Sequence, residues 1–81
     1  MSMPVSDRIA ADYRQRIRSG ALPTGTVLPT VEAIQAEYAA YGRDGKISAM
    51  PVRQALYALR NEGLVAFRPG VGNVVIGGTD G

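Results

Sequence analysis

The sequence of 81 residues contains no cysteine and no histidine. These absences exclude disulfides, zinc sites built on either residue, cysteine nucleophiles and histidine acid–base catalysis. Glu32, Glu37 and Glu62 stand alone, at spacings that suggest neither a catalytic pair nor a metal cluster. The Gly-x-Gly sequence at residues 70–72 lies between two predicted strands and opens no helix. We therefore predict no catalytic residues, no metal, no cofactor and no enzymatic activity.

Long apolar runs are also missing. No run approaches the roughly 20 residues of a transmembrane helix, and residues 1–4 lack the features of a signal peptide. We expect a cytoplasmic protein with no membrane partner. A chain of this length forms one domain, and 46% hydrophobic residues with 20% charged residues indicate a folded core. Because so short a chain buries limited apolar surface, we expect dimerisation to aid its stability.

The chain has a small excess of positive charge. Nine basic and seven acidic residues give a net charge of +2, and eight of the nine basic residues are arginine. Arginine suits forked contacts with phosphates and base edges, although a GC-rich genome would favour the same composition. The charge alone therefore favours nucleic-acid binding only weakly.

Hydrophobic spacing predicts three helices. The first follows Ser6 as N-cap and ends at residues 19–20, with a buried stripe at Ile9, Tyr13 and Ile17. The second follows Thr30 as N-cap. Its predicted buried positions recur at helical spacing: Val31, Ile34 and Tyr38.

The third helix is predicted over residues 49–62, with Ser48 as N-cap and Pro51 in its first turn. Gly63 ends it. Its buried stripe comprises Val52, Ala55, Leu56 and Leu59.

Two β-rich segments, residues 64–68 and 73–76, flank a Pro-Gly turn and predict a hairpin. A short strand at Thr26–Leu28 is expected to join them in a three-stranded sheet. The order of elements is that of a winged helix-turn-helix, with the hairpin as the wing. The predicted fold class is therefore mainly α with a small antiparallel sheet (α+β), comprising one domain at residues 1–76 and a flexible tail at 77–81.

The chain resembles the DNA-binding domain of the GntR family of bacterial transcription regulators. The matching stretches are IAADYRQRIRSGALPTGTVLPT at 9–30, VRQALYALRNEGLV at 52–65 and RPGVGNVV at 68–75. The resemblance implies a sequence-specific transcription regulator, most often a repressor, that binds double-stranded DNA as a homodimer in the nucleoid. Family members usually carry a C-terminal effector domain. Because this sequence ends five residues after the wing, we expect no small-molecule effector.

The sequence departs from the family pattern in two places. Glu32 and Ala49 stand where the family usually has DNA-reading arginines, whereas Arg53 is kept. Residues 39–45 lengthen the normally tight turn between the second and third helices. Base specificity therefore cannot be transferred from the family.

The third helix supplies most of the candidate DNA contacts. Arg53 and Gln54 can fork onto guanine and adenine, respectively, with a solvated helix face as the alternative. Ala49 and Met50 can touch a thymine methyl. The alternative is that these side chains pack against the protein or are simply exposed to solvent. Tyr57 can donate to a phosphate, but we favour a position at the rim of the core for this residue.

Further candidates flank that helix. The hydroxyls of Thr30 and Ser48 cap helices, and the same helix starts can hold phosphate. Arg68 and Gly70 lie in the wing and can contact a minor groove or phosphates. In the lengthened turn, Lys46 and Arg43 either reach phosphate or form a solvated loop. For the arginines of the first helix, Arg14 and Arg18, we favour a solvated face.

Two other functions remain open. One is an architectural or recombination accessory protein of a mobile element. The other is a winged helix adapted to protein binding, which the low net charge and the missing arginines favour.

Overall fold

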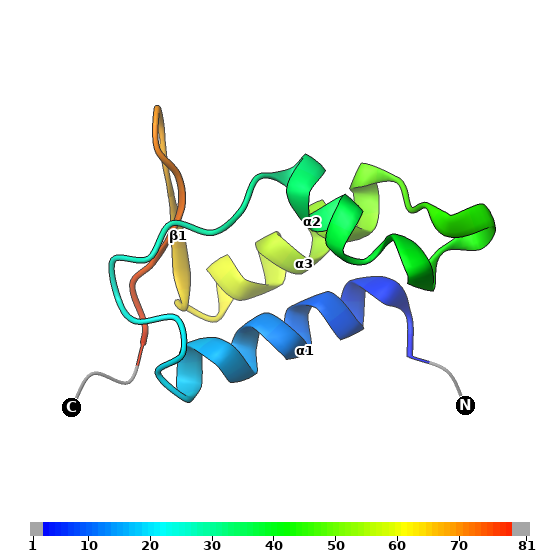
Figure 1. Cartoon of the computed structure of the whole chain (residues 1–81). Helices are drawn as coiled ribbons and strands as arrows, with labels where there is room; N and C mark the ends of the chain where they lie inside the picture. The colour runs from blue at the N-terminus through cyan, green and yellow to red at the C-terminus, as the bar shows by residue number, and fades with distance from the viewer. Residues whose placement is uncertain (1–2, 79–81) are drawn as a thin grey trace.

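Three helices pack together, and a β-hairpin projects beyond them at one end of the molecule (Figure 1). The computed structural model describes residues 3–78. The helices are α1 (Val5–Arg18), α2 (Val31–Glu37) and α3 (Ala49–Asn61), and the strands are β1 (Val65–Arg68) and β2 (Gly72–Val75). Two short 3-10 turns, η1 (Ala39–Tyr41) and η2 (Arg43–Gly45), separate α2 from α3. The predicted winged helix-turn-helix is confirmed.

Helix α1 begins two residues earlier than the sequence suggested. The N-cap is Pro4, whose carbonyl accepts from the amide of Arg8 at 3.0 Å. The prediction of Ser6 as N-cap was therefore wrong, and Ser6 lies inside the first turn. The fixed φ of proline, here −56°, suits entry into a helix.

The end of α3 agrees with the prediction that Gly63 terminates it. Gly63 has a φ of +77°, which favours glycine. Its amide donates to the carbonyl of Arg60, and the amide of Leu64 donates to that of Leu59. This pair of bonds is a Schellman motif, and it turns the chain directly from α3 into the hairpin.

The sheet has two strands rather than three. Strands β1 and β2 pair antiparallel, and the amide of Val71 closes the turn by donating to the carbonyl of Arg68 at 3.0 Å. Segment 26–28 joins β2 only through an isolated bridge between Val27 and Val74. Flanking breakers at Gly25 and Pro29 keep that segment too short for a regular ladder.

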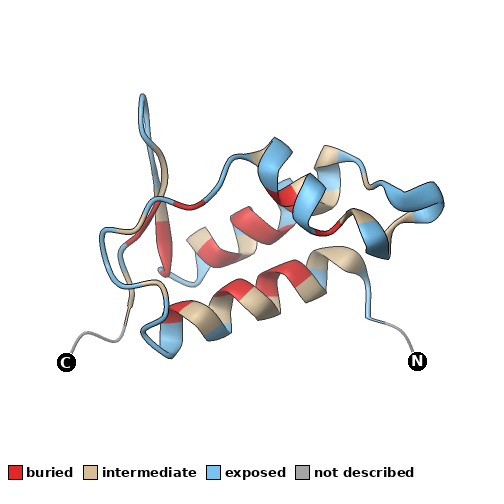
Figure 2. Ribbon diagram, in the orientation of Figure 1, coloured by how far each residue is buried: buried red, intermediate tan, exposed pale blue. Residues whose placement is uncertain are grey.

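The predicted helix stripes meet in the core between α1, α2, α3 and the base of the hairpin (Figure 2). Their buried members are Ile9, Tyr13, Ile17, Ile34, Tyr38, Val52, Ala55, Leu56 and Leu59. Val31 is half-buried and packs against this cluster. No helix within residues 3–78 is long and apolar enough to span a membrane.

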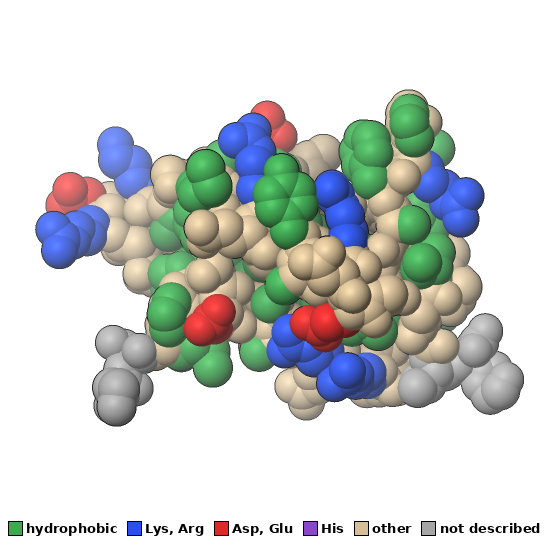
Figure 3. All heavy atoms as spheres, turned by 180° about the vertical axis from the view of Figure 1, so that it is seen from behind, with side chains coloured by type: hydrophobic (Ala, Val, Ile, Leu, Met, Phe, Trp, Pro, Cys, Tyr) green, Lys and Arg blue, Asp and Glu red, His purple; other side chains and the backbone are tan. Residues whose placement is uncertain are grey.

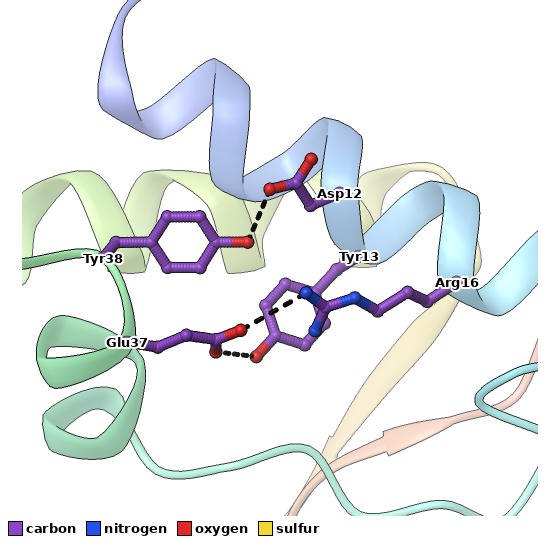
Figure 4. A network of polar contacts seen from close by, with 5 residues as sticks. All are labelled: Asp12, Tyr13, Arg16, Glu37 and Tyr38. Atoms are coloured by element: carbon purple, nitrogen blue, oxygen red, sulfur yellow. Dashed lines mark hydrogen bonds and ion pairs between the residues drawn. The ribbon is translucent and has the colours of Figure 1, made fainter. Parts of the chain in front are cut away.

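Polar contacts fix α2 against α1 at the edge of the core (Figure 4). The hydroxyl of Tyr13 donates to Glu37 Oε1 at 2.7 Å, and Arg16 Nη2 lies 3.3 Å from Glu37 Oε2. The hydroxyl of Tyr38 donates to Asp12 Oδ2 at 2.8 Å. These bonds join the C-terminal end of α2 to α1.

The last predicted segment, the tail at 77–81, is described only in part. The amide of Gly77 donates to the carbonyl of Leu64 at 3.1 Å, so the chain still lies against the hairpin at that point. Residues 79–81 lie outside the described part of the chain.

Candidate nucleic-acid interface

Helix α3 presents one buried and one exposed face. Because its apolar stripe is anchored in the core, the opposite side chains point to solvent. Arg53, Gln54, Met50 and Tyr57 are all exposed, at spacings of three and four residues that place them on one face. Ala49 is half-buried. Four of the five candidates on this helix therefore lie together on an accessible surface.

The side chains of Arg53 and Gln54 make no hydrogen bond or ion pair with other residues in the range 3–78. An arginine with no internal acceptor keeps all five N–H donors available, and a free glutamine amide offers both donors and an acceptor. These are the groups that bidentate base recognition requires.

The position of Tyr57 differs from the one that the sequence favoured. Its side chain is 52% exposed, so the favoured position at the rim of the core was wrong. The residue follows Arg53 by one turn, and the helix keeps both on the solvent side. Its ring lies 5.2 Å from the guanidinium carbon of Arg60.

The two predicted helix caps behave differently. Thr30 accepts a hydrogen bond from the amide of Ala33 at 3.1 Å, as predicted. Ser48 occupies the N-cap position of α3, but its hydroxyl makes no capping bond. The third helical residue is Pro51, which has no N–H to donate, so the usual partner is missing. The prediction that the Ser48 hydroxyl caps the helix was therefore wrong.

The lengthened turn is ordered rather than an open loop. Its two 3-10 turns project at the end of the molecule opposite the hairpin (Figure 1). The guanidinium carbon of Arg8 lies 4.6 Å from the centre of the Tyr41 ring and so attaches the turn to α1. Gln35 Nε2 donates to the carbonyl of Ile47 at 3.1 Å, which fixes the chain just before α3. Arg43 and Lys46 are exposed on this segment.

The hairpin carries exposed Arg68 beside the turn at Gly70. On the second strand of the hairpin, Asn73 Oδ1 accepts a hydrogen bond from Arg60 Nε at 2.9 Å. Arg60 is a residue that sequence reasoning missed. The available signal was its position three residues after Tyr57, on the same face of the third helix.

Two arginines of α1 are engaged in ion pairs. Arg14 donates to both carboxylate oxygens of Glu62 at the protein surface, so the side chain is partly exposed, as expected, but is held by a partner. Arg16 pairs with Glu37. Among the described residues, no three acidic side chains come together in a way that could hold a metal ion.

Basic and hydrophobic side chains lie next to each other across the upper half of the side that is hidden in Figure 1 (Figure 3). The exposed hydrophobic residues include Met50, Tyr57, Phe67 and Val71, from α3 and the hairpin. A surface of this composition can place positive charge on a phosphate backbone and apolar groups on base methyls.

Comparison with known proteins agrees with this arrangement. A sequence model described as bacterial regulatory proteins, gntR family, matches residues 5–75. A solved structure assigned as a GntR-family transcriptional regulator is 34% identical, with a TM-score of 0.76, over 91% of this chain and 26% of that chain. A GntR-family transcriptional regulator from Pseudomonas syringae pv. tomato str. DC3000 is 30% identical, with a TM-score of 0.64. The match covers 89% of this chain and 27% of that chain.

A third solved structure is the DNA-binding domain of AraR in complex with operator ORR3. It is 19% identical, with a TM-score of 0.78, over 93% of this chain and 82% of that chain, which shows a shared fold. No curated protein matches the sequence. The chain spans about a quarter of the length of the two GntR-family regulators.

Proposed function

The chain belongs to the gntR family of bacterial regulatory proteins, and we propose that it binds double-stranded DNA sequence-specifically and represses transcription. Residues 1–76 form the DNA-binding domain in this proposal. It assigns them no catalytic role, no cofactor and no small-molecule effector. The site of action is the nucleoid in the cytoplasm.

The observation that carries the proposal is the exposed, unpaired Arg53 and Gln54 on a helix whose opposite face is anchored in the core. In the proposed complex, α3 enters the major groove and these two side chains contact base edges. Ala49, Met50 and Tyr57 lie beside them against base methyls and phosphate.

The flanking elements contact the DNA backbone in the same proposal. Thr30 and Ser48 lie at the starts of α2 and α3, where exposed amides favour phosphate. Lys46 reaches phosphate beside α3. Arg68 and Gly70 of the hairpin approach the adjacent minor groove. The AraR domain, which shares the fold, was solved with operator DNA, and this supports the docking mode.

Selection of bound duplexes from a random pool, with native mass spectrometry in parallel, tests the proposal. We expect a two-fold symmetric motif to be enriched and a protein dimer to be detected on the selected duplex. A pool that shows no enriched motif after repeated rounds would contradict sequence-specific binding. Arrayed sites at an attachment site of a mobile element would favour the architectural function.

Protein binding is the second candidate function. Met50, Tyr57, Phe67 and Val71 are each more than half exposed, and exposed apolar patches often mark protein interfaces. A gel shift with random duplex DNA at low salt separates the two functions. Absence of any shift at micromolar protein would favour a protein partner.

A further inference from the structure

Arg60 lies in the corner between α3 and the hairpin, held by three side chains. Its Nε donates to Asn73 Oδ1 at 2.9 Å. Its guanidinium carbon lies 5.2 Å from the centre of the Tyr57 ring and 5.4 Å from that of Phe67. Arg60 thus joins the exposed face of α3 to the projecting hairpin.

The register of the hairpin explains this cluster. Phe67 and Asn73 are cross-strand partners, so their side chains lie on the same face of the sheet. The next pair on that face, Val65 and Val75, is buried in the core. Phe67 and Asn73 therefore continue the core-facing surface outward, where it leaves the core and meets Arg60.

The charge of Arg60 is not neutralised by this arrangement. Its hydrogen-bond acceptor is a neutral amide, and no carboxylate within residues 3–78 forms an ion pair with it. Arg14 and Arg16, in contrast, are each paired with a glutamate. An arginine has five N–H donors, and only Nε is used here, so both Nη groups of Arg60 have no acceptor in the described part of the chain.

The two aromatic rings restrict the side chain without consuming its charge. Stacking on Tyr57 and Phe67 orients the guanidinium and lowers the conformational entropy that would be lost on binding an anion. The hydroxyl of Tyr57 has no hydrogen-bond partner among residues 3–78 and can supply a further donor. The corner is therefore organised for an anion before any anion arrives.

We propose that Arg60 and the Tyr57 hydroxyl form a preorganised binding site for one phosphate of the DNA backbone. This inference rests on the proposed function. When α3 occupies the major groove and the hairpin the adjacent minor groove, the strand that separates the two grooves passes the corner where Arg60 lies. Asn73 and Phe67 act as positioning residues, because they orient the guanidinium without contacting the phosphate.

Two variants test the site, and each lowers the net charge of the protein by one unit. Arg60→Gln deletes the guanidinium. Asn73→Asp keeps Arg60 in place but gives it a carboxylate partner that competes with phosphate. Arg16→Gln is the matched control, since it removes a charge that Glu37 already neutralises on the α1–α2 side of the molecule. Far-ultraviolet circular dichroism checks the fold of all three.

The measured quantity is the salt dependence of binding to a selected duplex and to a random duplex. Loss of one phosphate contact reduces the slope of log K against log salt by about 0.9. For Arg60→Gln and Asn73→Asp, the ratio of dissociation constants at about 200 mM and about 50 mM salt should therefore fall about 3.5-fold relative to wild type. The reduction should be equal for both duplexes, because a phosphate contact carries no sequence information. Arg16→Gln should keep the wild-type slope.

A wild-type slope in either folded test variant overturns the inference, as does an equal reduction in Arg16→Gln. If Arg60→Gln fails to fold, Asn73→Asp decides alone, because it adds a favourable charge to an existing contact. Failure of the proposed function is a different result, namely that the wild-type protein binds neither duplex.

Discussion

Arg14 and Glu62 join α1 to the end of α3 through a bidentate ion pair. Arg14 Nε donates to Glu62 Oε1 at 2.7 Å, and Nη2 donates to Oε2 at 2.6 Å, across 48 positions of sequence. Both side chains remain about 30% exposed. The pair therefore ties the C-terminal end of α3 to the first helix at the protein surface.

Glu62→Gln should lower the free energy of unfolding by less than about 1 kcal/mol, since water and salt screen a pair this exposed. Hydrogen bonding from Arg14 lowers the pKa of Glu62. A lowered folded-state pKa contributes stability above the unfolded value of about 4.3, and that contribution disappears as the pH falls through the folded value. Urea unfolding of wild type and Glu62→Gln should therefore differ at pH 7 and converge in acid. An equal difference at both pH values would contradict this explanation.

The two buried tyrosines of the α1–α2 network predict a loss of stability in alkali. Burial raises the pKa of Tyr13 and of Tyr38, and hydrogen bonds to Glu37 and Asp12 raise it further. A raised folded-state pKa contributes stability that is complete below the unfolded value of about 10 and disappears as the pH rises through the folded value.

Tyr13→Phe should lower the free energy of unfolding by about 1–2 kcal/mol at pH 7, because it removes a hydrogen bond to a charged carboxylate. The double variant Tyr13→Phe/Tyr38→Phe should also lose less of its stability above pH about 10 than wild type does. Denaturant unfolding at pH 7 and at alkaline pH measures both effects. If wild type and the double variant lose the same free energy of unfolding in alkali, the two tyrosines do not cause the loss.

The lengthened turn leaves no room for a side chain at Gly42. Its backbone is extended, but a Cβ there would overlap the carbonyl oxygen of Lys46 and the side chain of Ile47. Gly42→Ala should lower the free energy of unfolding by about 1–3 kcal/mol and shift the amide resonances of the residues just before α3. Ala40→Ser, at an exposed position of the same turn, is the control and should leave both unchanged. An unperturbed Gly42→Ala would show that this close approach is absent in solution.

Periodic patterns predicted the core because burial follows the helical repeat. Ile9, Tyr13 and Ile17 are separated by four residues and are all buried on one side of α1. Thr30 was identified as a cap because a threonine before a helical stripe can accept from the first turn. These features depend on local geometry, which the order of residues determines.

Contacts between distant segments could not be read in the same way. Arg60 meets Asn73 only because the Schellman turn at Gly63 directs the hairpin back over α3. The pairing of Arg14 with Glu62 depends on how α1 and α3 cross in the folded protein. The uncapped Ser48 was predictable in principle, because Pro51 removes the amide that would have donated to it.

Arg53→Ala should weaken binding to the selected duplex by about 1–3 kcal/mol and relax the preference at one base position. The effect on random duplex DNA should be smaller, because the lost contact is to a base edge. Arg68→Ala should weaken binding to both duplexes equally, as expected for a backbone contact. Fluorescence anisotropy with both duplexes measures these effects. An Arg53→Ala protein that binds its best duplex as tightly as wild type would show that α3 does not read the bases.

In the proposed function, α3 and the hairpin together form a sequence-specific DNA-binding surface. The most direct test is the ratio of dissociation constants for a selected duplex and a scrambled duplex of equal length, measured at one salt concentration. The proposed function predicts that the selected duplex binds at least about 10³-fold more tightly. Equal affinity for the two duplexes, or no binding of either at micromolar protein in low salt, would contradict it.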